Sequence, residues 1–411
     1  MRLFYVFLAC IFVFSGCERR YFVNQVFAEV NDIVEIDPIF ELADEIAASF
    51  DDRLLAAQVL ISGIDGNRAV SPHMRELLEE IPVGGIMLFR YNLNTDNDVI
   101  KSFLGQADSI VTNESGVPPF IAVDHEGGTV NRFRRGVADL PSASFYWELL
   151  QTEEMEDVLL REDILLRIEE DSYRAGLAIN ALGFNMNFAP VAEFLIYDNR
   201  DFLAFRSYGP DPVFVSQAAK AFVRGMREAG ILCVAKHFPV SAGADPHYWL
   251  SELNKDRYEL DKVVFPFAQL IGYGIRAVMT AHTLIPMIDS EIASLSSIVM
   301  NDWLRGELGF DGIIISDDFI MTAASSGAAG NLTPEEAAVR SIIAGTDMIL
   351  VWPRDLRSTH TAILSALDDG RLSRERLVDA VRRIIYEKLK LGMLPIDCPS
   401  QEDSLLQEYF H

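Results

Sequence analysis

A histidine and a carboxylate two residues apart are the first sign of chemistry in this sequence. An apolar run ends at Lys236 and His237, and the segment that follows contains Asp245 and His247. In an extended segment, side chains at positions i and i+2 leave the same face, and Pro246 restricts the backbone between them. Asp245 would orient the His247 ring and stabilise its protonated form. The pair is a candidate proton-transfer device; a surface loop with a local Asp–His hydrogen bond is the alternative.

A second candidate is the pair Asp317 and Asp318, which directly follows the apolar run 312–315. A carboxylate that emerges from a buried strand is costly unless it is hydrogen-bonded or functional. Because successive strand residues alternate faces, we expect one carboxylate to face the site and the other to face the surrounding helices. A strand-end cap or an ion pair is the purely structural alternative.

A third candidate is a polar segment around Asp124 and Arg132, which flank the adjacent glycines Gly127 and Gly128. The glycines permit close approach or an unusual turn, and the two charged side chains could bracket a polyhydroxylated ligand. Arg206 lies in a long loop farther along the chain, from which it could reach the same place. A solvated loop arginine is the alternative for Arg206.

Metal and phosphate chemistry have weaker signals. The histidines His125, His237, His247 and His282 lie in separate segments, without a His-x-His at a strand end or a His-Glu-x-x-His helix. The sequence also lacks a Gly-x-x-x-x-Gly-Lys loop, and Ser241 has no Gly-x-Ser-x-Gly context. We therefore expect no metal site and no cofactor.

The elements that must position these residues are short apolar runs that alternate with helix-like segments. We expect strands at residues 58–62, 85–89, 120–123, 184–188, 232–235, 277–280, 312–315 and 348–352. We expect helices at residues 98–111, 212–229, 262–272 and 334–344, with one long helix at 373–391 after the eighth strand. Continuous apolar runs are typical of parallel strands that are covered on both faces. The pattern predicts a (β/α)8 barrel, with an open doubly wound sheet as the alternative.

The positions of the polar residues favour the barrel. Six of them lie at or just past the C-terminal ends of the apolar runs, namely Arg90, Asp124, Lys236, His237, His282 and Asp317. Barrel enzymes build their sites at this end of the strands. The predicted fold class is therefore α/β, a single (β/α)8 TIM-type barrel, and the chain has no room for a second large domain.

The composition restricts the partners. The chain of 411 residues has 61 acidic against 35 basic residues, a formal net charge of -26, which argues against nucleic acid as a partner. Its 50% hydrophobic content is enough for a large core. The sequence leaves the oligomeric state open, and we favour a monomer.

The N-terminus resembles an export signal. One arginine precedes an apolar run at residues 3–14, which is shorter than the roughly 20 residues of a membrane-spanning helix. Ser15-Gly16-Cys17 resembles a bacterial lipobox, although Phe14 stands where leucine is usual. We expect residues 1–17 to be a lipoprotein signal with lipidation at Cys17, which would hold an exported protein at the membrane of the cell envelope. An ordinary cleaved signal peptide is the alternative.

The remaining boundaries follow from the same pattern. We expect residues 18–49 to be an acidic tether and leading helix, residues 50–396 to form the barrel, and residues 397–411 to form a C-terminal tail. Cys233 lies in an apolar strand and Cys398 lies near the C-terminus. This distribution predicts no disulfide framework.

Five motifs in the same order resemble glycoside hydrolase family 3, and most closely its bacterial β-N-acetylhexosaminidases. They are Ala122-Val-Asp-His-Glu-Gly-Gly, Arg206-Ser-Tyr-Gly, Ala235-Lys-His-Phe-Pro, Met279-Thr-Ala-His and Ser316-Asp-Asp. The similarity covers residues 54–394. The resemblance implies a retaining hydrolase that removes terminal β-linked N-acetylglucosamine, in many members during peptidoglycan recycling.

The resemblance also implies a role for each matching residue. Asp317 would be the nucleophile, and His247, oriented by Asp245, would be the general acid/base. The residues expected to bind the sugar hydroxyls and the N-acetyl group are Asp124, Arg132, Arg206, Lys236 and His237. A histidine replaces one of the usual two carboxylates, but one group still attacks the anomeric carbon while the other protonates the leaving oxygen.

This chain departs from the family pattern beside the Asp-His pair. Relatives usually have Lys-His-Phe-Pro-Gly-His-Gly-Asp before an Asp-Ser-His dyad; here the segment is two residues shorter, Val240 replaces a glycine and Pro246 stiffens the dyad. We expect a less mobile loop, which would affect the rate and the leaving-group specificity. Glu193 also stands where relatives commonly have aspartate.

Two other functions remain open. One is a β-glucosidase or β-xylosidase of the same family, but these enzymes generally take their acid/base from another region or domain. The other is a non-catalytic envelope lipoprotein that binds wall fragments, because the altered segment before the dyad is what loss of activity would produce.

Overall fold

The computed structural model describes residues 37–134, 136–151, 158–242, 251–320 and 332–395. The chain comprises two units, Met1–Leu42 and Ala43–His411, and the sheet lies in the second. The described residues of the first unit begin helix α3 (Pro38–Ser49), where the sequence predicts a leading helix. The predicted signal at residues 1–17 and the tail at 397–411 lie outside the described residues.

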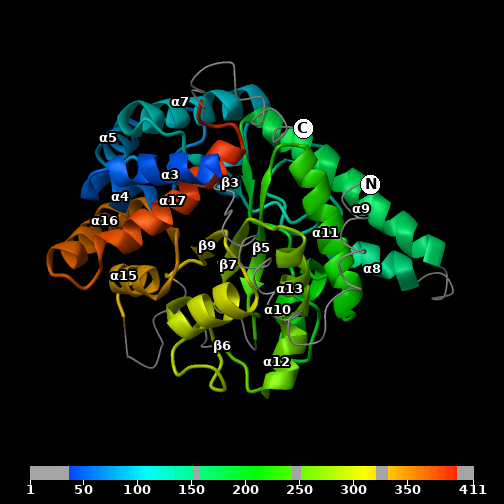
Figure 1. Cartoon of the computed structure of the whole chain (residues 1–411). Helices are drawn as coiled ribbons and strands as arrows, with labels where there is room; N and C mark the ends of the chain where they lie inside the picture. Colours follow the sequence, from blue (N-terminus) through cyan, green and yellow to red (C-terminus); the bar gives the residue numbers. More distant parts are fainter. Residues whose placement is uncertain (1–36, 135, 152–157, 243–250, 321–331, 396–411) are drawn as a thin grey trace, which may run out of the picture. The chain divides into compact units, whose positions relative to one another are not determined.

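Eight parallel strands form the sheet, in the order β10-β1-β2-β3-β4-β5-β7-β9. Figure 1 labels β3, β5, β7 and β9 among them. They are β1 (Leu60–Gly63), β2 (Gly85–Leu88), β3 (Phe120–Val123), β4 (Met186–Asn187), β5 (Leu232–Phe238), β7 (Ala277–Thr280), β9 (Ile313–Ser316) and β10 (Ile349–Val351). A parallel bridge from Ile315 to Met348 brings the two edge strands together. The predicted strands and the (β/α)8 barrel are confirmed, and the open sheet is not adopted.

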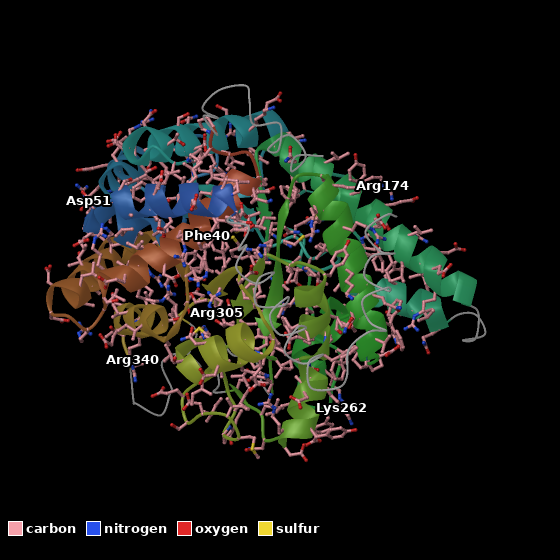
Figure 2. All side chains as sticks on the ribbon, in the orientation of Figure 1. Phe40, Asp51, Arg174, Lys262, Arg305 and Arg340 are labelled. Carbon is pink, nitrogen blue, oxygen red and sulfur yellow. The ribbon has the colours of Figure 1, made fainter. Side chains whose placement is uncertain are left out.

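Helices surround the strands, and Figure 1 shows α9 beside α11. They are α4 (Asp52–Gln58), α5 (Pro72–Glu80), α6 (Arg90–Leu93), α7 (Asn97–Ser115), α8 (Ala143–Gln151), α9 (Val158–Leu182), α10 (Arg200–Leu203), α11 (Pro212–Glu228), α12 (Arg257–Val263), α13 (Phe265–Gly272), α15 (Pro334–Ala344), α16 (Pro353–Asp368) and α17 (Arg374–Lys390). Shorter turns are η2 (Ala204–Arg206), η3 (Ala293–Leu295) and the π-helical η4 (Ile298–Glu307). Charged side chains such as Arg174 and Lys262 point outward (Figure 2).

Two helix predictions are wrong in detail. The predicted helix at 262–272 is divided between α12 and α13, because Pro266 lies in the first turn of α13 and favours a new helix start. Two helices, not one, follow the eighth strand. Pro353 begins α16, and Gly370, with a φ of 77°, lies in the turn before α17.

The strands are buried along their whole length, as their continuous apolar character predicts. Aromatic rings fill the layer between strands and helices: Phe238 of β5 meets Phe267 of α13 and Trp303 of η4, with ring centroids 5.4 and 5.6 Å apart. A short parallel pair, β6 (Ser251–Glu252) and β8 (Thr283–Leu284), lies outside the main sheet. Among the described helices, none is both long and apolar enough to cross a membrane.

One buried lysine lies among these packed residues. Lys388 of α17 is fully buried, and its Nζ donates to Gln58 Oε1 at 3.1 Å. The ammonium also lies 5.2 Å from the ring centroid of Phe120, the first residue of β3. Because burial disfavours the charged form, the pKa of Lys388 is lowered to about 7.

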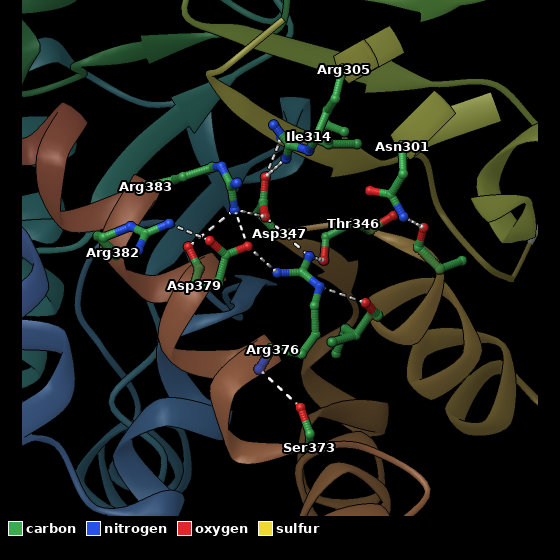
Figure 3. Close-up of polar contacts among 12 residues, drawn as sticks. Asn301, Arg305, Ile314, Thr346, Asp347, Ser373, Arg376, Asp379, Arg382 and Arg383 are labelled. Atoms are coloured by element: carbon green, nitrogen blue, oxygen red, sulfur yellow. Dashed lines mark hydrogen bonds and ion pairs between the residues drawn. The ribbon is translucent and has the colours of Figure 1, made fainter. Parts of the chain in front are cut away.

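The junction between β9 and β10 is held by Asp347, which is fully buried. Its backbone N donates to Ile314 O at 2.8 Å, and its side chain accepts from Ile314 N at 2.9 Å. Figure 3 shows Arg305, Arg376 and Arg383 converging on the same carboxylate, with the first two at 2.6 and 3.0 Å. Burial alone would raise the pKa of Asp347, but the arginines outweigh it and lower the pKa below its ordinary value of 3.8.

We predict that Asp347→Asn destabilises the fold by about 3 to 5 kcal/mol at neutral pH, because it leaves buried guanidinium groups without their counterion. Because the pKa of Asp347 is lowered in the folded state, its ionised carboxylate stabilises the fold at pH values above the ordinary pKa of 3.8. This stabilisation is lost as the pH falls below that value. Urea unfolding followed by circular dichroism should therefore show that the difference in unfolding free energy between Asp347→Asn and the wild type becomes smaller in acid. Asp369→Asn, which breaks an exposed pair with Arg371, is the control. Equal effects of the two substitutions would contradict the assigned role.

Candidate active site

A buried ammonium group is the centre of the charged cluster at the C-terminal ends of the strands. Lys236 comes from the end of β5, and its side chain is 3% exposed. Its Nζ lies 2.8 Å from Asp124 Oδ1 and 2.6 Å from Glu126 Oε1, both in the segment after β3. Burial opposes the charge, but the two carboxylates outweigh it and raise the pKa of Lys236. The group is therefore a fixed cation.

Two arginines extend this cluster. Arg206, at the end of η2, forms a bidentate ion pair with Glu126: its Nε and Nη2 each donate to a carboxylate oxygen at 2.8 Å. Arg132 Nη2 lies 3.0 Å from Asp124 Oδ2. Burial would raise the pKa of both acids, but the cations outweigh it and hold both pKa values below the ordinary range. The result is a chain of alternating charges that can both donate to and accept from the hydroxyl groups of a ligand.

The adjacent glycines Gly127 and Gly128 allow the segment after Asp124 to pack closely against Pro141 and Ser142. Gly127 and Gly128 have φ angles of 92° and 56°, which favour glycine. A Cβ on Gly127 would lie 2.1 Å from Pro141 O, and one on Gly128 would lie 2.5 Å from Ser142 Cβ. The expectation of close approach at this double glycine is confirmed.

A second buried carboxylate, Glu193, organises His237. Glu193 Oε1 lies 2.7 Å from His237 Nδ1 and also accepts from the His237 backbone N at 3.2 Å. The same side chain accepts from the backbone N and the Oγ of Ser241. His237 Nε2 is thereby directed towards Arg206 Nη2, 3.4 Å away. Glu193 thus joins the end of β5 to the start of the segment that contains the Asp-His pair.

The two aspartates after β9 face different surroundings, as the alternation of strand residues predicts. Asp317 lines a small cavity together with His237, Ser241 and His282. Asp318 instead accepts from Trp352 Nε1 at 2.6 Å and lies among residues of α15 and α16. Burial raises the pKa of Asp318. Asp317 is therefore the member of the pair that shares a cavity with His237, which contacts Arg206 of the charged cluster.

The structure thus brings Asp124, Arg132, Arg206, Lys236 and His237 into one connected network, with Asp317 in the adjoining cavity. Their roles in binding and catalysis stay predictions. The predicted pair Asp245 and His247, and the predicted lipidation site Cys17, lie outside the described residues.

The residues on either side of the segment 243–250 are firmly held. Ala242 N donates to Ser251 Oγ at 3.0 Å, and Ser251 Oγ lies 3.1 Å from Thr283 Oγ1. Thr283 Oγ1 in turn donates to Val240 O at 2.7 Å, and Val240 is buried. Val240, which replaces a glycine of the family pattern, is therefore a packed residue at the start of this segment.

Sequence reasoning missed the role of Glu126. The available signal is its spacing: Glu126 follows Asp124 by two positions in the segment after β3, a spacing that puts side chains on one side of an extended chain.

The ring of His282 is held on both sides. Its Nδ1 lies 2.7 Å from Ser294 Oγ, and its Nε2 lies 3.1 Å from the backbone O of Asp318. Within the described ranges, no group of three or more His, Cys, Asp or Glu side chains could hold a metal ion.

We predict that Glu126→Gln lowers the free energy of unfolding by about 3 to 5 kcal/mol, because the buried cations Lys236 and Arg206 then lose the carboxylate that pairs with both of them. Chemical denaturation at neutral pH measures the change. Glu80→Gln is the matched control, since Glu80 forms an exposed pair with Arg357 and its loss should have little effect. A Glu126 variant as stable as this control would contradict the charge network.

Known proteins with similar sequences support this picture. The family model described as the Glycosyl hydrolase family 3 N terminal domain matches residues 52–386. A beta-hexosaminidase of Hydrogenovibrio crunogenus is 32% identical over 313 residues, which is 75% of this chain and 83% of the relative. A beta-hexosaminidase of Stenotrophomonas maltophilia is 31% identical over 80% of this chain and 98% of the relative.

Solved structures agree. A glycoside hydrolase family 3 beta-N-acetylglucosaminidase from Paenibacillus sp. str. FPU-7 has a TM-score of 0.75 and 31% identity, covering 88% of this chain and 67% of that chain. NagZ from Neisseria gonorrhoeae, in complex with N-trifluoroacetyl-D-glucosamine, has a TM-score of 0.64 and 26% identity, covering 80% of this chain and 89% of that chain.

Proposed function

This chain belongs to glycoside hydrolase family 3 and is a glycosidase, and from that premise we propose that it is a retaining exo-β-N-acetylglucosaminidase. The observation that carries this proposal is the cavity that Asp317 shares with His237, beside the network of Lys236, Asp124, Glu126 and Arg206. A nucleophile beside a set of hydroxyl-binding groups is what hydrolysis of a terminal sugar requires.

The charged network supplies recognition of the sugar. Asp124 accepts hydrogen bonds, while Lys236 and Arg206 donate them, so that vicinal hydroxyl groups can each find a charged partner. Glu126 holds both cations, and Glu193 fixes His237. The site is therefore organised before the ligand arrives, which lowers the cost of binding in the reactive orientation.

The chemistry is a double displacement. Asp317 attacks the anomeric carbon, the bond to the leaving oxygen breaks, and His247, oriented by Asp245, gives a proton to that oxygen. Water then attacks the glycosyl ester while His247 takes a proton from it, which frees Asp317 and the sugar with retained configuration.

The choice of N-acetylglucosamine rests on the relatives, whose names are beta-hexosaminidase and beta-N-acetylglucosaminidase. The family alternative, a β-glucosidase or β-xylosidase, would show equal or faster hydrolysis of glucosides or xylosides. We propose fragments of peptidoglycan as the natural substrate class.

We predict that Asp317→Asn lowers kcat on p-nitrophenyl N-acetyl-β-D-glucosaminide by at least about 1000-fold, because an amide cannot form the glycosyl ester. Release of p-nitrophenol measures the rate. Asp355→Asn, on α16 outside the cavity, is the control and should retain full activity. Equal rates in wild type and Asp317→Asn would remove the proposed nucleophile, and no turnover by wild type at high enzyme concentration would favour the non-catalytic binding protein.

We also propose that the enzyme is exported and held at the cell envelope by lipid on Cys17. We predict that Cys17→Ser moves the full-length protein from the detergent phase to the aqueous phase in a Triton X-114 partition of bacterial cells that express it, because one uncharged hydroxyl replaces the acylated thiol. A wild-type protein found wholly in the aqueous phase would contradict the anchor.

A further inference from the structure

The backbone N–H of Asp318 orients the carboxylate of Asp317. It donates to Asp317 Oδ1 at 2.8 Å, and among the described residues no other hydrogen bond reaches this carboxylate. Oδ1 is therefore held in place, while Oδ2 keeps its lone pairs for another partner. Whatever fixes the backbone of Asp318 thus also fixes the plane of the Asp317 carboxylate.

The strand itself holds Asp317 only weakly. β9 ends at Ser316, so that Asp317 lies one residue beyond the strand. Its backbone N lies 3.4 Å from Thr280 O at the end of β7, which is longer than the usual 2.7 to 3.2 Å of such a hydrogen bond. The orientation of Asp317 therefore depends on the residue that follows it.

The carbonyl of Asp318 is held by His282. Nε2 of this buried ring lies 3.1 Å from Asp318 O, which can only accept, so that Nε2 carries the proton. Burial lowers the pKa of His282 and keeps the ring neutral. Nδ1 then accepts from the Ser294 hydroxyl at 2.7 Å. The Ser294 carbonyl is itself held, since it accepts from Ser341 Oγ at 2.7 Å.

The side chain of Asp318 is held at both oxygens. Oδ1 accepts from Ile320 N at 2.9 Å, which closes a local turn of the kind that aspartate favours. Oδ2 accepts from Trp352 Nε1 at 2.6 Å. Burial raises the pKa of Asp318, and the two donors oppose this rise. Asp318 is thus fixed through its N–H, its carbonyl and its side chain.

Trp352 reaches Asp318 from another strand. It directly follows β10, and its ring stacks on Phe89 with centroids 4.7 Å apart and planes 7° apart. The ring also lines a groove of about 1240 Å³ that the loops after β2 and β3 form, with Arg132 among its walls. Asp318 instead lines a smaller pocket beside α15 and α16. Because the stacking fixes the indole ring, its N–H is a fixed donor to Asp318.

We propose that Trp352 is a positioning residue: through its hydrogen bond to Asp318, it keeps the Asp317 carboxylate in the orientation that attacks the anomeric carbon. The inference rests on the proposed function and adds a residue that acts through Asp318 rather than on the reacting atoms. The orientation matters because a misplacement of about 1 Å can lower a rate by about 100-fold.

Trp352→Phe removes the N–H and keeps an aromatic ring against Phe89. We predict that it lowers kcat/KM on p-nitrophenyl N-acetyl-β-D-glucosaminide about 10- to 100-fold, because the Asp317 carboxylate is held less firmly while the glycosyl ester forms. The inhibition constant Ki of N-acetylglucosamine should stay within about twofold of the wild-type value, since the charged network binds the free sugar. Release of p-nitrophenol measures both quantities.

Asp318→Asn tests the same bond from its other side. The amide has one oxygen for two donors, Trp352 Nε1 and Ile320 N, so that we expect a similar loss of kcat/KM without a change in Ki. The double variant should lose no more than about twofold beyond the more impaired single variant, because both substitutions break one bond. A loss that arose in the groove would not be shared by Asp318, which lies outside it.

Tyr146→Phe is the matched control. It also removes an aromatic donor to a buried aspartate, namely the bond from Tyr146 Oη to Asp171 Oδ2 at 2.9 Å, which joins α8 to α9. This variant should unfold at a lower temperature than wild type, as followed by circular dichroism, but should keep the wild-type kcat/KM.

Three results would overturn the inference and leave the glycosidase assignment intact: a wild-type kcat/KM in Trp352→Phe, a rise in Ki that matches the loss of kcat/KM, or multiplied losses in the double variant. If Trp352→Phe does not fold, Asp318→Asn decides: a loss of kcat/KM with unchanged Ki supports the inference, and a wild-type kcat/KM overturns it. Absence of hydrolysis by wild type, or a wild-type rate in Asp317→Asn, would instead overturn the proposed function.

Discussion

The burial of the Lys236 ammonium is the constraint on which the arrangement at the C-terminal ends of the barrel strands depends. A charged side chain that is only 3% exposed is tolerated only when counterions lie close to it. Asp124 and Glu126, in the segment after β3, are those counterions. Because Glu126 also holds Arg206, and Asp124 also holds Arg132, one buried cation fixes the relative positions of three separate segments. The same pairing places Arg132 beside the groove and Arg206 next to His237, which lines the cavity.

The opposite end of the strands uses the inverse arrangement. There a buried carboxylate, Asp347, is surrounded by guanidinium groups, and its backbone joins β9 to the start of β10, where the two edge strands of the sheet meet. Both clusters stabilise the fold only as complete sets, since removal of one member leaves an uncompensated charge. The cluster around Asp347 closes the barrel, whereas the cluster around Lys236 is open to a groove and a cavity.

Much of this architecture could be predicted, because strands that are buried on both faces must be apolar throughout and their polar residues must gather at the ends. The positions of Asp124, Lys236 and Asp317 follow from that rule. Helix boundaries were harder: Pro266 and Pro353 each begin a helix, a signal that periodicity alone does not contain. The partnership of Glu126 with Arg206 joins residues 80 positions apart. Such a pair depends on the path of a long loop, which no local pattern specifies.

Lys388 has a further consequence for the chemistry of the folded chain. With its pKa lowered to about 7, a substantial share of this amine is uncharged at neutral pH and is therefore nucleophilic, yet the packing of α17 against α4 and β3 shields it from solvent. An acylating reagent could reach it only when the surrounding elements separate. The rate at which this amine is modified would thus report how often α17 separates from the elements packed around it.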